Sequence, residues 1–314
     1  METLEEIGGY FELELRKGEH YHKGAIRLNS GRNCFEYILR ARGYKKVYMP
    51  YYTCQVMFDT ATRCGVEILC YRINEQLEPI ELPKLNFGEA FLYTNYYGLK
   101  QPCVERLAER YGKQLIVDNA QAFYTKPIAG IDTFYSPRKF FGVPDGGYLY
   151  TDAILNEELP QARSYERMSH LLKRIEYGAQ AGYDMFKKNQ KSFGDSPIER
   201  MSKLTCALLE NIDYETALKR RRNNYMRLHE ELYEINTIEF ALGDAVPIVY
   251  PFMTKDVNLR ARLIENNIYV ASYWPKVENN DSVESLLKER LIPLPIDQRY
   301  GEKEMQKIIN VIKG

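Results

Sequence analysis

The feature that most constrains the fold is an alternation of short apolar runs and amphipathic segments between residues 25 and 150. The apolar runs predict strands at residues 45–50, 66–72, 89–98, 114–121 and 146–152. The amphipathic segments predict helices at residues 31–43, 52–65 and 101–112. Strands separated by helices form βαβ units, so the sequence predicts an α/β fold with a mainly parallel sheet covered on both faces.

The pattern changes beyond residue 155. Residues 155–236 are rich in Arg, Lys and Glu and predict helices, with a break at 194–197. The remaining segments predict a strand at 246–252, a helix at 257–267, a strand at 268–274 and a closing amphipathic helix at 301–313. We therefore expect a large domain over residues 1–213, with residues 1–24 as an N-terminal arm, and a linking helix with a small C-terminal α+β domain over 214–314.

Composition excludes several classes of function. Lys+Arg and Asp+Glu both number 43 among 314 residues, so the balance of charge indicates no nucleic-acid or anionic-membrane partner. The first residues lack the apolar region of a secretory signal, and no stretch approaches the roughly 18 apolar residues of a membrane span. Six cysteines lack zinc-ligand spacing: Cys34, Cys54, Cys64, Cys70, Cys103 and Cys206. We expect a cytoplasmic protein with reduced thiols and no metal.

Residues 29–33, NSGRN, directly precede a predicted helix. Ser30 can cap that helix, Gly31 allows close backbone approach, and the first N–H groups of the helix can bind a phosphate. Taken alone, these residues favour the alternative of an ordinary helix cap.

Asp118 ends a strongly apolar predicted strand, where an unpaired carboxylate is costly. It could bind a metal, act as a general base or pair with a protonated ring nitrogen, and a helix cap or turn is the plain alternative.

Lys139 follows 21 residues later, beside two phenylalanines and before the turn Pro144–Gly147. A lysine desolvated by aromatic neighbours becomes a nucleophile able to form a Schiff base, although most lysines simply extend to the surface. A phosphate-binding helix start, an acid at a strand end and a buried lysine, in this order, are the parts that hold pyridoxal 5'-phosphate.

The same segments resemble the DegT/DnrJ/StrS-type aminotransferases, within the aspartate aminotransferase (fold type I) superfamily. The resemblance covers residues from about 25 to the end: the SG helix start, the D-x-A-Q motif of LIVDNAQAFY, the lysine segment YSPRKFFGVPDGG and the C-terminal segment with its leucine-proline turn. It implies a three-layer α/β/α large domain with a small C-terminal domain, pyridoxal 5'-phosphate as cofactor, and a homodimer.

The resemblance also implies residue roles. Lys139 would hold the cofactor aldehyde and move a proton, and Asp118 would pair with the pyridine nitrogen. Gln121 would lie near the ring and its 3-oxygen, and backbone groups of Arg32 and Asn33 would hold the phosphate.

Three positions depart from the family pattern. Cys54, beside Tyr51 and Tyr52, stands where the family stacks an aromatic residue on the cofactor. Phe134 stands where it has a phosphate-binding hydroxyl, a role that Ser136 would take over. The chain is also shorter than typical members, around residues 155–215.

The leading hypothesis is an aminotransferase that moves an amino group from glutamate or glutamine to a keto group, in this family often on a nucleotide-linked sugar. A dehydratase-like enzyme and a non-catalytic regulatory or scaffold protein are the alternatives. Relatives that dehydrate have histidine in place of the lysine, so Lys139 favours transamination.

Overall fold

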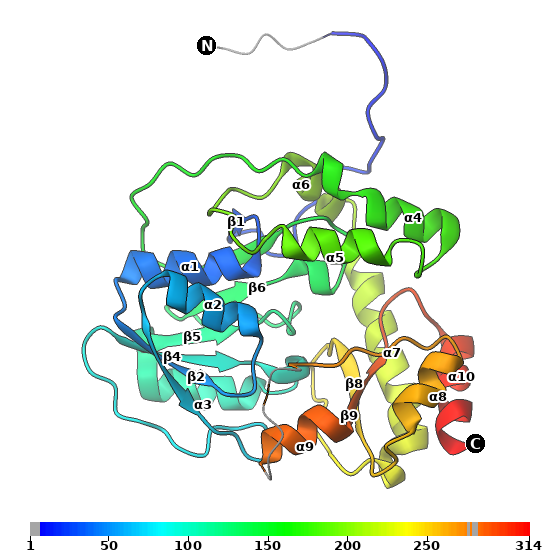
Figure 1. The fold of residues 1–314 in the computed structure, drawn as a ribbon. Coiled ribbons are helices and arrows are strands. Elements are labelled where there is room, and N and C mark those ends of the chain that lie inside the picture. Colours follow the sequence, from blue (N-terminus) through cyan, green and yellow to red (C-terminus); the bar gives the residue numbers. More distant parts are fainter. Residues whose placement is uncertain (1–6, 275–276, 278–281) are drawn as a thin grey trace.

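The computed structural model describes residues 7–274, 277 and 282–314, and its centre is a seven-stranded sheet (Figure 1). The strand order is β1-β7-β6-β5-β4-β2-β3, with β1 and β7 antiparallel to their neighbours and the other strands parallel. The strands are β1 Ile26–Leu28, β2 Lys46–Pro50, β3 Glu67–Tyr71, β4 Glu89–Thr94, β5 Leu115–Asp118, β6 Asp132–Tyr135 and β7 Gly147–Tyr150. The predicted α/β fold with a mainly parallel sheet is confirmed.

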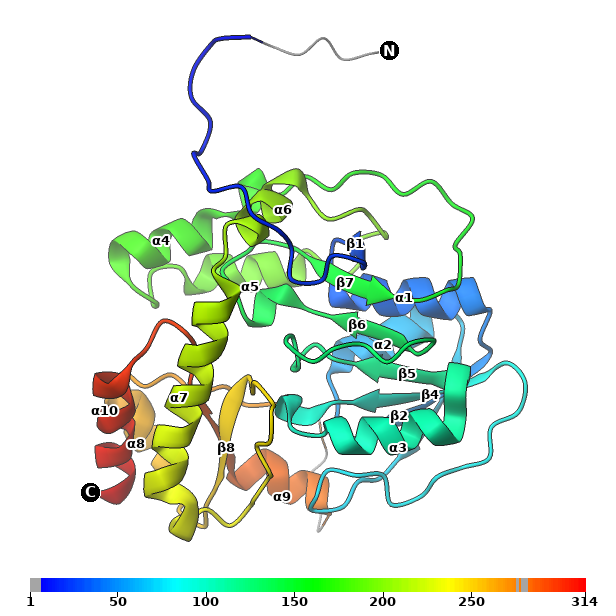
Figure 2. The ribbon, with the colours of Figure 1, turned by 180° about the vertical axis from the view of Figure 1, so that it is seen from behind.

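Helices cover both faces of this sheet. The helices of the first 232 residues are α1 Gly31–Arg42, α2 Gln55–Arg63, α3 Gln101–Tyr111, α4 Ser169–Tyr177, α5 Tyr183–Lys191, α6 Lys203–Glu210 and α7 Tyr214–Leu232. α1 and α2 lie over one face, and α3 lies over the other (Figures 1 and 2). Neighbouring side chains of β4 point to opposite faces of the sheet. Leu92 belongs to the hydrophobic cluster that contains residues of α1, and Phe91 to the cluster that contains residues of α3.

A two-stranded antiparallel sheet organises the C-terminal part. It pairs β8, Val249–Met253, with β9, Leu291–Pro295, beside α8 Leu259–Glu265, α9 Val283–Arg290 and α10 Glu302–Lys313. The long helix α7 runs from the large sheet down to this smaller one (Figure 2). One continuous hydrophobic cluster contains residues of both sheets, among them Tyr93 and Tyr250.

Three sequence expectations differ from the structure. Residues 268–274 form no strand, and the partner of β8 is instead β9, which was not predicted. The short strands β1 and β6 were also missed. The region 155–236 is not helical throughout, because residues 151–164 form no helix before α4 begins.

The N-terminal arm starts away from the rest of the chain and leads into β1, which pairs with β7 (Figure 1). Its first six residues lie outside the described part. His20 Nδ1 lies 2.5 Å from the Tyr148 hydroxyl, and His22 Nε2 lies 2.8 Å from the carbonyl oxygen of Phe123. No helix among the described residues is both long and apolar enough to cross a membrane.

Candidate functional site

Lys139 closes a short 3₁₀ turn, Pro137–Lys139, that follows β6. Its backbone N–H donates to the carbonyl of Ser136 at 3.2 Å. Phe140 and Phe141 are only 4% and 6% exposed and pack into the core, whereas Lys139 itself is exposed. The prediction of a buried lysine among aromatic side chains is therefore wrong, because the turn directs the two phenylalanines inward and leaves the lysine outside.

The start of α1 lies beside this turn. Ser30 is the helix cap, and its hydroxyl oxygen accepts the N–H of Asn33 at 3.2 Å. The N–H of Asn33 is therefore occupied within the protein. A side chain on Gly31 would meet Ser136, whose Cβ would lie 3.6 Å from the added carbon. The helix start and the residue before the lysine turn thus lie in contact.

The glycine pair 146–147 allows the start of β7 to lie close to the start of α1. Gly146 has a φ of 121°, which only glycine adopts easily. A Cβ on Gly147 would lie 2.6 Å from the carbonyl oxygen of Ser30 and 2.8 Å from Cys34 Sγ. The glycines therefore let the start of β7 pass directly against the start of α1.

Asp118 is the last residue of β5 and is paired in register with Thr94 of β4 and Phe134 of β6. It is 6% exposed, and its carboxylate accepts the N–H of Ala120 at 2.8 Å. Burial raises the pKa of Asp118, while the positive charge of Lys139 acts in the opposite direction. The buried carboxylate and the lysine therefore interact electrostatically at the carboxyl edge of the sheet.

Gln121 lies in the loop after β5 and is 1% exposed. Its Oε1 accepts the backbone N–H of Tyr97 at 2.8 Å, but its Nε2 has no hydrogen-bond partner. Tyr97 has a left-handed φ of 56°, and its carbonyl accepts the N–H of Ile248 at 3.1 Å. Because buried amide groups are normally hydrogen-bonded, the free Nε2 is a donor that a ligand atom could use.

Cys54 lies at the start of α2 and is partly buried. It contributes to the electrostatic surroundings of Arg32. Of the neighbouring tyrosines, Tyr52 is 1% exposed and packs edge-on against Trp274, with ring centroids 4.3 Å apart. Phe134 is likewise in the core, beside Phe35, so the hydroxyl nearest the start of α1 on this strand end belongs to Ser136.

A segment that the sequence did not assign to the site covers the start of α1. Asn33 Nδ2 donates to the carbonyl of Ser196 at 3.2 Å, and Asn29 Nδ2 donates to Glu199 at 3.1 Å. Arg63 of α2 donates to the carbonyl of Gly194 at 2.9 Å. In the sequence, only the predicted break at residues 194–197 marked this segment.

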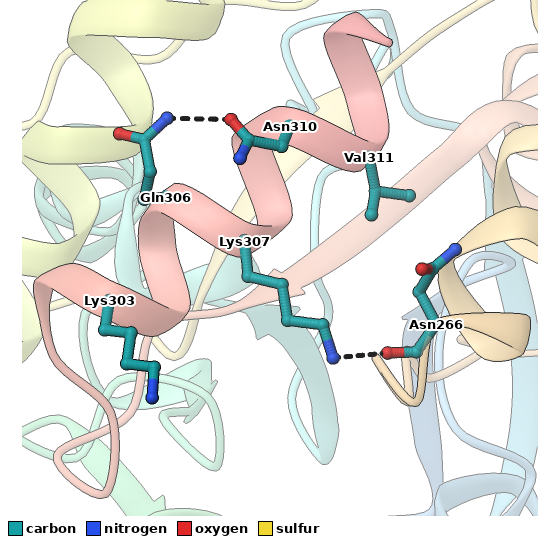
Figure 3. Close-up of a pocket in the computed structure, with 6 residues that line it drawn as sticks. All are labelled: Asn266, Lys303, Gln306, Lys307, Asn310 and Val311. Atoms are coloured by element: carbon teal, nitrogen blue, oxygen red, sulfur yellow. Dashed lines mark hydrogen bonds between the residues drawn. The ribbon is translucent and has the colours of Figure 1, made fainter.

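A metal site and a second pocket are the two other kinds of site to consider. Among the described residues, no group of three or more His, Cys, Asp or Glu side chains is arranged to hold a metal ion. A shallow hollow lies elsewhere, between α8 and α10, and Figure 3 shows Lys307 reaching across it to the carbonyl of Asn266. It shares no residue with the edge formed by Asp118, Gln121 and Lys139.

The mainly parallel sheet carries an acid, a lysine turn and a helix start at its carboxyl edge. No protein-family model matches this chain, and no curated protein is significantly similar to it in sequence. Solved structures do match. A DegT/DnrJ/EryC1/StrS aminotransferase from Brucella abortus is 18% identical, with a TM-score of 0.64 over 92% of this chain and 85% of the other.

Two further structures show the same likeness. NtdA from Bacillus subtilis, with bound cofactor PMP, is 17% identical with a TM-score of 0.65, over 92% of this chain and 73% of its own. DesI, in the presence of its TDP-sugar product, is 13% identical with a TM-score of 0.63, over 92% and 79% of the two chains. The fold predicted from the DegT-type resemblance is confirmed.

Proposed function

We propose that this protein is an aminotransferase that uses pyridoxal 5'-phosphate. The observation that carries the proposal is the group formed by buried Asp118, the unpartnered amide of Gln121 and exposed Lys139 at one edge of the sheet. The likeness of the fold to sugar aminotransferases supports the same function.

The residues present fit the cofactor. Asp118 would pair with the protonated ring nitrogen, which would give its buried charge a partner. Gln121 Nε2 would donate to the ring oxygen, and Cys54 would lie against the ring. Ser136 and the start of α1 would hold the phosphate, chiefly through the backbone N–H of Arg32, because that of Asn33 already donates to Ser30.

The cofactor supplies an electron sink, and the protein supplies positioning and proton transfer. Lys139 would hold the cofactor aldehyde and would then carry a proton between carbon atoms of the substrate and the cofactor. Its exposed position leaves room for a substrate to approach. A glutamate or glutamine donor and a keto acceptor are proposed. A nucleotide-linked keto sugar is the proposed acceptor because DesI was solved in the presence of its TDP-sugar product.

We also infer a homodimer. Ile7, Tyr10 and Phe11 of the N-terminal arm are more than 90% exposed in the single chain. Large apolar side chains of this kind are usually covered by another surface, and a second copy of the chain is the proposed cover.

Absorbance spectroscopy with added amino donors tests the function. The purified protein should be yellow, borohydride should attach the cofactor to Lys139, and glutamate or glutamine should yield pyridoxamine phosphate and the corresponding keto acid. Lys139→Ala should abolish this half-reaction and leave the fold intact, while Lys126→Ala, at another exposed lysine, should retain it.

Two results would contradict the proposal. A colourless protein that takes up no added cofactor would remove both the aminotransferase and the dehydratase-like function. Cofactor binding with an unchanged spectrum across a panel of amino donors would instead favour a non-catalytic regulatory or scaffold role.

A further inference from the structure

Three arginines from separate parts of the chain surround one buried aromatic ring. Their guanidinium carbons lie 4.4 Å, 4.9 Å and 6.0 Å from the ring centroid of Phe193, for Arg138, Arg167 and Arg32 respectively. Phe193 is completely buried. We call these four residues the arginine cluster.

The arginine cluster contains more positive than negative charge. Asp145 is the acid beside it, with an oxygen 3.8 Å from Arg167 Nη2. The carboxylate of Asp145 already accepts hydrogen bonds from the N–H and hydroxyl of Ser202 and from the hydroxyl of Thr205. Asp145 acts on Arg138 and Arg167, and Asp59 of α2 acts on Arg32. Asp59 also accepts a hydrogen bond from Gln55, so the three guanidinium groups face two carboxylates that are both already engaged.

One of these guanidinium groups lacks a partner. Arg138 Nε is buried and makes no hydrogen bond in the described structure. Burial lowers the pKa of Arg138 to about 10, and the charges of Arg32 and Arg167 add to this effect. Packing on Phe193 accounts for the flat faces of the side chains but leaves this N–H donor unexplained, since buried donors normally have an acceptor.

The position of the arginine cluster indicates what would provide the acceptor. Arg138 directly precedes Lys139, and Arg32 is the second residue of α1. Gly31 and Ser136, their neighbours in sequence, are in contact. The cluster is thus part of the corner where the lysine turn meets the helix start.

We propose that Arg32, Arg138 and Arg167 bind a phosphate group at this corner. A phosphate monoester carries a charge near −2 and several oxygen acceptors, which match three arginines whose nearby carboxylates, Asp145 and Asp59, already accept hydrogen bonds. Planar guanidinium groups bind such oxygens in pairs, and Arg138 Nε gains the acceptor it lacks. The segment that carries Phe193 holds the arginines in place and is itself fixed to α1 through Asn29 and Asn33.

Two molecules could supply this phosphate group, and both follow from the proposed aminotransferase function. One is the monoester of the cofactor, and the other is the diphosphate of a nucleotide-linked acceptor. Both present the same chemistry to the arginine cluster, so binding experiments must separate them.

Binding is measured on the full-length protein by thermal unfolding and spectral titration with four probes: inorganic phosphate, pyridoxal 5'-phosphate, pyridoxal and a nucleoside diphosphate. Arg138→Met and Arg32→Met are compared with wild type, and Arg174→Met, an exposed arginine of α4, is the matched control. Arg138→Lys retains the charge without the planar group. Near-ultraviolet circular dichroism verifies that each variant is folded.

If the cofactor is the source, Arg138→Met loses about tenfold or more of its affinity for pyridoxal 5'-phosphate and retains its affinity for pyridoxal. If the acceptor is the source, cofactor affinity is retained, and the nucleoside diphosphate stabilises wild type but not the variant. Arg138→Lys should be intermediate in either case, and Arg174→Met should resemble wild type.

Equal binding of every phosphate-bearing probe by wild type, Arg138→Met and Arg32→Met would overturn the proposal and leave the arginines a packing role on Phe193. So would a wild-type protein that responds to none of them. Stabilisation by inorganic phosphate without any uptake of pyridoxal 5'-phosphate would contradict the proposed function and support the phosphate site.

Discussion

Arg138 of the lysine turn and Arg221 of α7 both pack on a phenylalanine ring, but they differ in their hydrogen bonds. Arg221 lies 4.6 Å from the ring centroid of Phe140, and Arg138 lies 4.4 Å from that of Phe193. Burial lowers the pKa of each to about 10. Arg221, however, donates to Gln298, to the carbonyl of Ile248 and to the carbonyl of Phe140, whereas Arg138 Nε donates to nothing.

The difference in hydrogen bonding indicates a structural role for Arg221 and a binding role for Arg138. Arg221 of α7 connects the small sheet to the lysine turn, because it donates to the residue that follows Lys139. Gln298 donates to the same Phe140 carbonyl at 2.8 Å. All three nitrogens of Arg221 donate, so removing this side chain would leave three acceptors unpaired. A buried donor without an acceptor, as at Arg138 Nε, instead costs stability.

The largest effect is expected at Arg221. Arg221→Met removes the donor to three acceptors in a buried place, so the free energy of unfolding should fall by about 3 kcal/mol. Denaturant unfolding measures this, and Arg220→Met, at an exposed neighbour, should change it by less than about 0.5 kcal/mol. Equal losses in the two variants would remove the structural role assigned to Arg221.

Asp118 is a buried carboxylate and can be compared with the two arginines. Burial raises its pKa above the ordinary value of 3.8, so its ionised form is less favourable in the folded than in the unfolded chain. Asp118→Asn should therefore stabilise the cofactor-free protein at pH 7, by about 1 kcal/mol, while it weakens cofactor binding.

The sign of the pH dependence follows from the same shift. The folded state keeps its proton to higher pH, so the cost of Asp118 grows as pH rises through the raised pKa and vanishes below about 3.8. The difference in unfolding free energy between wild type and Asp118→Asn should shrink accordingly towards pH 4. A variant less stable than wild type at pH 7 would show that Asp118 already has a sufficient partner.

The smallest effect is expected at Arg138. In buffer free of phosphate, Arg138→Met should leave the free energy of unfolding unchanged or raise it by less than about 1 kcal/mol, because it removes a buried unpaired donor and relieves repulsion from Arg32 and Arg167. Denaturant unfolding of this variant beside Arg221→Met gives the sharpest contrast. If Arg138→Met lowered the free energy of unfolding as much as Arg221→Met, both arginines would have a structural role.

Sequence periodicity predicted the helices of the large sheet and most of its parallel strands, since these segments follow the local rules of burial. It failed at β9, whose sequence LIPLP contains Pro293 and Pro295. Proline is normally excluded from central strands, but a two-stranded sheet has only edges, so β9 tolerates both. Residues 268–274 are equally apolar yet have no strand to pair with.

Some features of the candidate site could also be predicted from the sequence, and others could not. Asp118, Lys139 and the helix start were visible in the sequence because each carries a local signal next to a strand or helix end. The exposure of Lys139 was not, since it depends on the direction of a 3₁₀ turn. The arginine cluster was also invisible, because it joins residues 32, 138, 167 and 193 through tertiary packing alone.

Tyr97 connects the two sheets at the site. Its backbone is fixed from one side by Gln121 and from the other by Ile248, just before β8, in a left-handed conformation that costs on the order of 1 kcal/mol. A swing of the small sheet relative to the large one would pull on Tyr97 and shift the amide of Gln121. Two hydrogen bonds of the Tyr97 backbone therefore couple the position of the C-terminal part to the amide of Gln121.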